Sequence, residues 1–141
     1  MDVDSIEIRL VKSWPVDEIV KLYTAGGWWK DSYDPMVINN LIFGSFAFAV
    51  VYDKNIKKAV GMGRVLSDGV SDAYIQDLII LPNYRNLGLG RKLVDFLINQ
   101  CKEKGVGWIG VIAEPGSEEF YKRLGFKNMK NHKPMLLQME E

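Results

Sequence analysis

At residues 81–92 the chain reads Leu81-Pro82-Asn83-Tyr84-Arg85-Asn86-Leu87-Gly88-Leu89-Gly90-Arg91-Lys92. This stretch decides the fold because it joins residues 74–81, whose second half is apolar throughout, to apolar residues at helical spacing. The first pattern predicts a strand at the centre of a sheet, and the second predicts a long amphipathic helix. Glycines at the junction let the helix-start amides point outward together. Those amides, with Arg85, Arg91 and Lys92 beside them, predict a site for a pyrophosphate.

Two other phosphate-binding patterns are excluded by the residues around Gly88-Leu89-Gly90. The dinucleotide fingerprint needs a third glycine where Leu93 stands, and the motif here occurs late in the chain. The nucleoside-triphosphate loop needs Gly-Lys-Ser or Gly-Lys-Thr, which this stretch lacks. Gly-x-Gly by itself also fits a plain strand-to-helix turn. The prediction of a pyrophosphate site therefore depends on the position of this motif between a buried strand and a long helix.

Outward from this junction, alternating or helical spacing of apolar residues predicts the other elements. The expected strands are 6–11, 46–52, 59–66, 74–81, 108–113 and 135–139, and the expected helices are 15–25, 35–43, 89–104 and 117–124. Gly61 and Gly63 inside one strand indicate close backbone packing. No linker, repeat or low-complexity stretch interrupts the pattern, so we expect a single α/β domain over residues 1–141.

The composition narrows the class of protein. Hydrophobic residues make up 48% of the chain, an ordinary globular share. Eighteen basic residues balance eighteen acidic ones, which argues against nucleic-acid binding through an overall positive field. Cys101 is the only cysteine, so neither an intramolecular disulfide nor a cysteine-based metal cluster can form, and we expect no metal. No run approaches the roughly 20 apolar residues of a membrane span. We expect a cytoplasmic domain with no membrane or nucleic-acid partner.

Two motifs carry a family resemblance. Arg85-Asn86-Leu87-Gly88-Leu89-Gly90 follows the fourth expected strand, and Phe120-Tyr121 stands close to Gly125-Phe126. Together they resemble the GCN5-related N-acetyltransferase (GNAT) superfamily, whose signature is Arg or Gln, two residues, Gly, one residue, then Gly or Ala. The order of elements agrees over nearly the whole chain. One departure is Glu114, where many members carry Asn.

The resemblance implies the GNAT acyl-CoA N-acyltransferase fold, a mixed sheet of about six to seven strands with about four helices. It also implies acetyl-CoA as cofactor. The backbone of Leu78, Ile79 and Ile80 would pair with the pantetheine arm. The pyrophosphate would lie on the amides of Arg85, Asn86, Leu87, Gly88, Leu89, Gly90, Arg91 and Lys92.

Tyr121 matches the family tyrosine that contacts the cofactor and protonates the departing thiolate. A thiol has an ordinary pKa of about 8.5 and a tyrosine one of about 10, which makes Tyr121 a plausible acid. A partly buried structural aromatic is the alternative.

The acceptor amine must lose a proton before or during transfer. An alkylammonium has an ordinary pKa of about 10.4, so reaching the neutral form at pH 7 costs roughly 4 to 5 kcal/mol. Asp77, a carboxylate inside an otherwise apolar strand, is the candidate base. The alternative is a structural carboxylate satisfied by backbone amides where the strands separate, and both readings stay open. His132 lies in a polar turn and is expected to be a solvated surface residue.

Aromatic residues mark a candidate acceptor pocket. Trp28 and Trp29 follow the first expected helix, where the family forms one wall of the substrate pocket, while Tyr74 and Gln76 precede Asp77 on the fourth expected strand. Aromatic walls suit an apolar or aromatic amine, and residues 60–77 resemble small members that acetylate arylalkylamines. The two tryptophans fit an ordinary core equally well.

Three functions follow from this reading. The first is acetylation of a small primary amine, the second is acetylation of a protein at its N-terminus or a lysine, and the third is acyl-CoA binding without catalysis. Tyr121 and Asp77 favour an enzyme over a binding module. The resemblance further implies a homodimer, which is common in the family.

Overall fold

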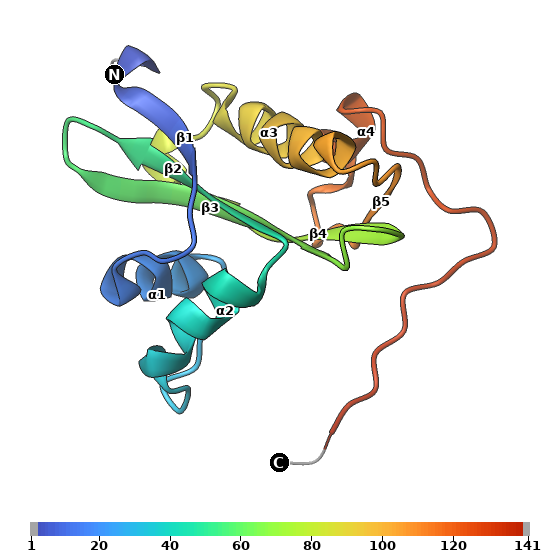
Figure 1. Ribbon diagram of the computed structural model, residues 1–141, viewed down its shortest axis with the longest axis horizontal. Helices are drawn as coiled ribbons and strands as arrows, with labels where there is room; N and C mark the ends of the chain where they lie inside the picture. The colour runs from blue at the N-terminus through green and yellow to red at the C-terminus, as the bar shows by residue number, and fades with distance from the viewer. Residues whose placement is uncertain (1–2, 140–141) are drawn as a thin grey trace. The chain divides into compact units, whose positions relative to one another are not determined.

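The computed structural model describes residues 3–139 and divides into two compact units, Met1–Val111 and Ile112–Glu141. Figure 1 shows the elements along the chain. In the first unit they are η1 (Val3–Ser5), β1 (Ile6–Leu10), α1 (Val16–Ala25), η2 (Pro35–Val37), α2 (Ile38–Gly44), β2 (Ala47–Asp53), β3 (Lys58–Ser67), β4 (Asp72–Ile80), η3 (Pro82–Tyr84), α3 (Leu89–Glu103) and β5 (Trp108–Val111). The second unit contains α4 (Glu118–Arg123). Each corresponds to an expected element, with small shifts at the ends, apart from the short 3-10 helices.

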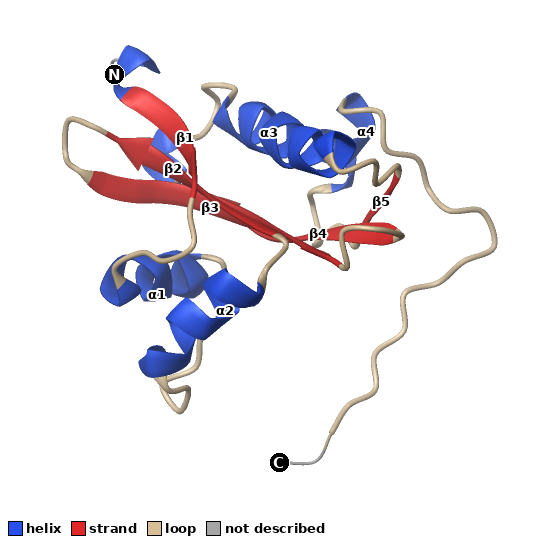
Figure 2. Cartoon of the chain, viewed as in Figure 1, coloured by secondary structure: helices blue, strands red, loops and turns tan. Residues whose placement is uncertain are grey.

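The sheet has the order β1-β2-β3-β4-β5 (Figure 2). Strands β1 to β4 are antiparallel neighbours, whereas β4 and β5 are parallel. A parallel pair needs a crossover connection, and α3 supplies it between β4 and β5. The mixed sheet with four α-helices is therefore confirmed, with five strands among residues 3–139 instead of six or seven.

Helices cover both faces of the sheet, with α1 and α2 on one face and α3 on the other (Figure 1). Side chains of α1 and α2 pack with Phe48, Val50 and Met62, which alternate along β2 and β3. Gly63 lies on the opposite face, where a Cβ would be 2.7 Å from Leu78 Cδ1 and 3.1 Å from Leu97 Cδ1. Only glycine lets α3 and the β4 side chains approach β3 this closely, which confirms the close packing expected there.

The expected strand at 135–139 is wrong. Residues 132–139 have no regular structure, and Met135 has 93% of its surface exposed. A strand needs a neighbour to satisfy its backbone, and α4 is the one helix or strand among the described residues of the second unit. The apolar run Met135-Leu136-Leu137 therefore has no partner strand within its own unit.

The core placement of Cys101 is confirmed, since this α3 residue is fully buried. Burial raises the pKa of its thiol, as expected for a small apolar core residue. Among residues 3–139, no helix combines the length and the apolar character that crossing a membrane requires.

Candidate functional site

The site begins where β4 and β5 separate. Pairing of the two strands runs from Asp72–Trp108 to Ile75–Val111 and stops there, while β4 continues to Ile80. The Leu81 N–H donates to Val60 O on the β3 side at 2.9 Å. Because N–H groups alternate between the two edges of a strand, the amides of Leu78 and Ile80 face the edge that β5 leaves open.

This alternation narrows the set of residues whose amides can pair with an extended ligand. Leu78 and Ile80 offer their amides to the open edge, whereas the Ile79 amide faces β3 and its side chain packs against the core under α1. Arg85 Nε donates to Ile80 O at 2.9 Å and so covers the end of this edge. An extended chain with its own carbonyl and amide groups fits the exposed backbone between Leu78 and Ile80.

A β-bulge sets the direction of Asp77. Met62 pairs with Ile79 and Arg64 pairs with Gln76, so Gly63 alone opposes the two residues Asp77 and Leu78. Asp77 has a φ of 58°, in the left-handed region. In a regular strand residue 77 would share the α3 face with residues 73 and 75. The bulge instead turns the Asp77 side chain toward α1.

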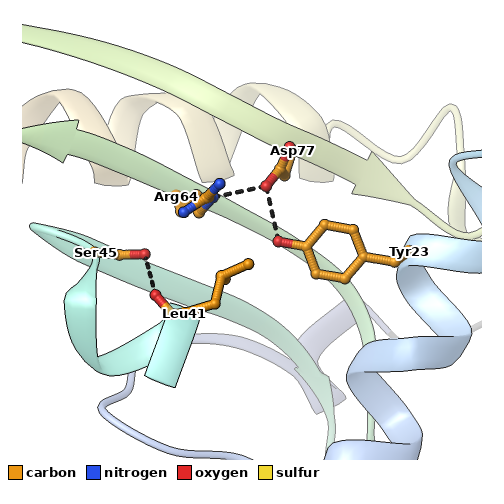
Figure 3. Close-up of polar contacts among 5 residues, drawn as sticks. All are labelled: Tyr23, Leu41, Ser45, Arg64 and Asp77. Carbon is orange, nitrogen blue, oxygen red and sulfur yellow. Dashed lines mark hydrogen bonds and ion pairs between the residues drawn. The ribbon is translucent and has the colours of Figure 1, made fainter. Parts of the chain in front are cut away.

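Asp77 is held by two side chains (Figure 3). The Tyr23 hydroxyl, from α1, donates to Asp77 Oδ2 at 2.7 Å, and Arg64 Nε, from β3, donates to the same oxygen at 2.6 Å. The Arg64 and Asp77 side chains are 16% and 21% exposed. Burial and the negative Asp77 raise the pKa of Tyr23 above its ordinary value, so Tyr23 remains a protonated donor. The structural alternative assumed backbone amides as partners, and the actual partners are these two side chains.

The predicted phosphate loop has the geometry of an anion cradle. Asn86 and Gly88 have φ values of 63° and 77°, and Gly88 is the N-cap of α3. The Lys92 N–H donates to Gly88 O at 3.2 Å, so the amides of residues 89–91 precede the helical hydrogen-bond ladder. A Cβ on Gly88 would meet no atom within 4 Å, so the space beside this residue is open. This arrangement fits a pyrophosphate.

The cations of the loop are not equivalent. Arg85 directs its Nε onto Ile80 O. Arg91 Nε lies 3.9 Å from Asp95 Oδ2 in an exposed ion pair, and the negative Asp95 offsets part of the positive charge of Arg91. Within residues 3–139 Lys92 has no such ion pair, and it is exposed in the first turn of α3. We therefore expect the backbone amides to contribute more than the arginine side chains to anion binding at this loop.

Tyr84 anchors the start of this loop, a contact that sequence reasoning missed. Its hydroxyl donates at 2.6 Å to Oδ2 of Asp53, a buried residue at the end of β2. Oδ1 of Asp53 accepts from the Asn55 N–H at 2.9 Å and the Ser5 hydroxyl at 3.3 Å. The Tyr84 hydrogen bond first, and then these other donors, lower the pKa of Asp53. The sequence gives little indication of this contact, because Asp53 has the pattern of an ordinary turn residue.

We expect Tyr84→Phe to destabilise the fold by about 1 to 2 kcal/mol at pH 7, since it removes a hydrogen bond to a charged group. The folded pKa of Asp53 lies below the unfolded value of about 3.9. This stabilisation is therefore present above about pH 4 and is lost as the pH falls through the folded value. Urea unfolding at pH 7 and pH 3 measures it, and an equal difference from wild type at both pH values would contradict the assignment.

Tyr121 belongs to the second unit. It lies on α4 with 8% of its surface exposed, and its ring makes edge-to-face contacts with Phe120 and Phe126 at centroid distances of 5.0 and 5.6 Å. Burial, and then the negative charge of Glu114, raise the pKa of Tyr121 to about 12. Within residues 3–139 its hydroxyl makes no hydrogen bond, in contrast to those of Tyr23 and Tyr84. The phenol is therefore protonated at neutral pH and available as a donor.

The aromatic residues expected at the acceptor pocket divide into two groups. Trp28 and Trp29 are half-buried and pack against the core under α1, and Trp28 contacts the Tyr23 ring edge-to-face at 6.2 Å. Tyr74 is 43% exposed and contacts Trp108, a residue that the sequence did not single out, at 5.3 Å. Both tryptophans thus have a core role, and Trp28 also supports the tyrosine that holds Asp77.

Tyr74 and Gln76 lie on the same face of the sheet as Arg64. The register pairs Leu66 with Tyr74 and Arg64 with Gln76, and paired residues share a face. Both β4 side chains are exposed. The first unit therefore brings Tyr74, Gln76 and Asp77 together on the α1 face, next to the point where β4 and β5 separate. His132 is exposed in its polar turn, as expected.

Comparison with known proteins agrees with this geometry. The family model described as an acetyltransferase (GNAT) domain matches residues 25–134. An uncharacterized N-acetyltransferase, ycf52, from Pyropia yezoensis is 34% identical over 110 residues, which cover 77% of this chain and 63% of that protein. Serotonin N-acetyltransferase 2, chloroplastic, from Oryza sativa subsp. japonica is 38% identical over 69 residues, covering 49% and 34%.

A solved structure shares the fold. The GNAT-family acetyltransferase SP0256 from Streptococcus pneumoniae superposes with a TM-score of 0.75 at 24% identity, and the match covers 96% of this chain and 99% of that one. The chain spans less than two thirds of the length of the two curated relatives above. The family model alone covers well over half of the chain, and the chain therefore belongs to the GNAT acetyltransferase family.

Proposed function

We propose that this protein is an acetyl-CoA-dependent N-acetyltransferase that acts on a small primary amine. The observation that carries the proposal is the open edge of β4, which leads directly into the amide cradle at the start of α3. A strand edge suits the amide-bearing pantetheine arm, and the cradle suits the pyrophosphate. Family membership supports the same cofactor.

Several groups have defined tasks in binding the cofactor. The backbone of Leu78 and Ile80 pairs with the pantetheine arm, and one of these amides donates to the thioester oxygen, where negative charge develops during transfer. The amides from Arg85 to Lys92 hold the pyrophosphate, with space at Gly88 for its approach. When bound, acetyl-CoA supplies the activated acetyl group.

Tyr121 and Asp77 move the protons in this proposal. As the acetyl carbon passes from sulfur to nitrogen, the amine gives up a proton to Asp77 and the thiolate receives one from Tyr121. The phenol of Tyr121 is protonated at neutral pH, as the role requires, but its raised pKa of about 12 makes it a weaker acid than an ordinary tyrosine. We therefore place the contribution of Tyr121 at the lower end for general acid catalysis, about 10²-fold.

The acceptor in this proposal is a small amine with an apolar or aromatic body. Support comes from the exposed Tyr74 beside Trp108, from Gln76, and from Trp28 next to the Tyr23 ring. The resemblance to a protein named serotonin N-acetyltransferase points to the same class of acceptor. Aromatic surfaces contribute apolar contact area around one polar amine. Homodimer formation and a cytoplasmic location stay predictions, and the named rice relative is chloroplastic.

Binding is expected to depend on the phosphates. Calorimetry should detect acetyl-CoA with an affinity that falls as salt rises, and much weaker binding of pantetheine, which lacks the phosphates. Equal affinity for the two ligands would exclude the amide cradle as the pyrophosphate site.

The acceptor class is tested by release of free CoA. Arylalkylamines, polyamines, amino sugars and lysine-containing peptides should be compared at equal concentration, and arylalkylamines should give the highest kcat/KM. A preference for peptides would favour protein acetylation, while acetyl-CoA binding without transfer to any acceptor would favour a binding module.

A further inference from the structure

We infer that Tyr23 and Arg64 are positioning residues for catalysis: they hold Asp77 Oδ2 from two elements, so that Oδ1 faces the acceptor amine. This inference rests on the proposed function and extends it to two residues that sequence reasoning did not identify. Their approach to one oxygen is drawn in Figure 3.

The two carboxylate oxygens of Asp77 have different surroundings. Both donors, at 2.7 and 2.6 Å, reach Oδ2. Neither of these hydrogen bonds reaches Oδ1, and residues 3–139 contain no buried side-chain oxygen without a partner. Oδ1 is therefore in contact with solvent, and it is the oxygen that an entering amine reaches.

The two donors also offset the cost of the backbone conformation at Asp77. A non-glycine residue in the left-handed region costs roughly 1 kcal/mol, and Asp77 adopts that conformation. Two charge-assisted or short hydrogen bonds stabilise the turned side chain against this cost. Tyr23 is itself fixed, since its ring is buried and contacts Trp28, so the carboxylate is held against a rigid element.

Tyr23 stays a donor to Asp77 around neutral pH. Tyr23 from α1 and Arg64 from β3 are the titratable or charged groups that contact Asp77 among the described residues. Burial raises the pKa of Tyr23 further above neutral pH, so its hydroxyl keeps the proton that it donates to Asp77. The Tyr23 hydrogen bond to Asp77 is therefore retained around neutral pH.

Tyr23→Phe keeps the buried ring and removes the hydroxyl donor. We expect kcat/KM for the amine to fall about tenfold at pH 7, with the KM for acetyl-CoA unchanged within twofold. The difference in kcat/KM from wild type should become smaller toward pH 9 to 10. At that pH more of the amine is already deprotonated in solution, so a base is needed less. A purely structural role would lower the melting temperature and give a loss that does not vary with pH.

Arg64 gives a second, independent test. Arg64→Met should show the same pH-dependent loss, and Arg64→Lys should recover part of the rate because it keeps the charge. Arg9→Met and Tyr52→Phe are controls on β1 and β2, which β3 separates from Asp77 on β4. Arg9 pairs with Glu7 and lies over the Tyr52 ring, and that ring contacts Trp14. Both controls should keep the wild-type pH profile.

A double-mutant cycle decides whether the pair acts through Asp77. Asp77→Asn alone should lower the rate most at neutral pH, and Tyr23→Phe should add nothing to it if Tyr23 acts only by positioning that carboxylate. Losses that multiply in the double variant, or single variants with a wild-type profile, would overturn the inference while wild-type transfer stands. Absence of transfer by the wild type to every amine would overturn the proposed function, and this role with it.

Discussion

Tyr121→Phe is expected to lower the turnover number about 10²-fold while leaving the affinity for acetyl-CoA nearly unchanged. The substitution removes the phenolic proton but keeps the ring that packs between Phe120 and Phe126. The α4 helix should therefore remain folded, and the loss should appear in kcat. Steady-state release of CoA measures the rate, and calorimetry measures the affinity.

Tyr52→Phe is the control for this change. Tyr52 contacts Trp14 through its ring, and phenylalanine preserves that contact, so turnover should stay at the wild-type level. Full turnover by Tyr121→Phe with the best acceptor would remove Tyr121 from the role of acid and leave it as a packing residue of α4.

Gly88→Leu is expected to weaken acetyl-CoA binding at least about 100-fold. The added side chain would occupy the open space beside Gly88, the N-cap of α3, and we expect it to block the approach of the phosphates to the first-turn amides. The positive φ of Gly88 adds a conformational cost of roughly 1 kcal/mol, which affects stability. Calorimetry and thermal unfolding separate these two effects.

Gly105→Leu is a closely matched control at the opposite end of α3. Gly105 has a φ of 79°, against 77° for Gly88, and a Cβ there also meets nothing within 4 Å. Both variants should lose similar stability, and Gly105→Leu should keep its affinity for acetyl-CoA. If the two variants bind acetyl-CoA equally well, the cradle at Gly88 is not the phosphate site.

The order of the elements could be predicted because most of them carry strong local signals. Apolar spacing defined α3, and Pro82 together with the glycines marked the junction between β4 and this helix. The exception, residues 135–139, shows the limit of this reasoning. A short apolar run indicates that a segment can form a strand, but the strand forms only where another backbone is available to pair with it.

The candidate site was predictable only where its chemistry lies in a contiguous motif. The loop from Arg85 to Lys92 could be recognised from the sequence, and Asp77 was conspicuous as a carboxylate in an apolar strand. Tyr23 and Arg64 were not, because they are 54 and 13 residues from Asp77 and meet it through the bulge opposite Gly63. One extra residue in a strand reverses the face of a side chain, and periodicity alone does not reveal it.

The central claim is transfer of an acetyl group from acetyl-CoA to a small primary amine. The most direct measurement uses acetyl-CoA with a ¹³C-labelled acetyl group and tryptamine, with mass spectrometry of the product over time. We expect labelled N-acetyltryptamine to form at a rate that saturates in both reactants and falls in Tyr121→Phe. Labelled product at no more than the protein-free rate, for tryptamine and for every other amine tried, would contradict it.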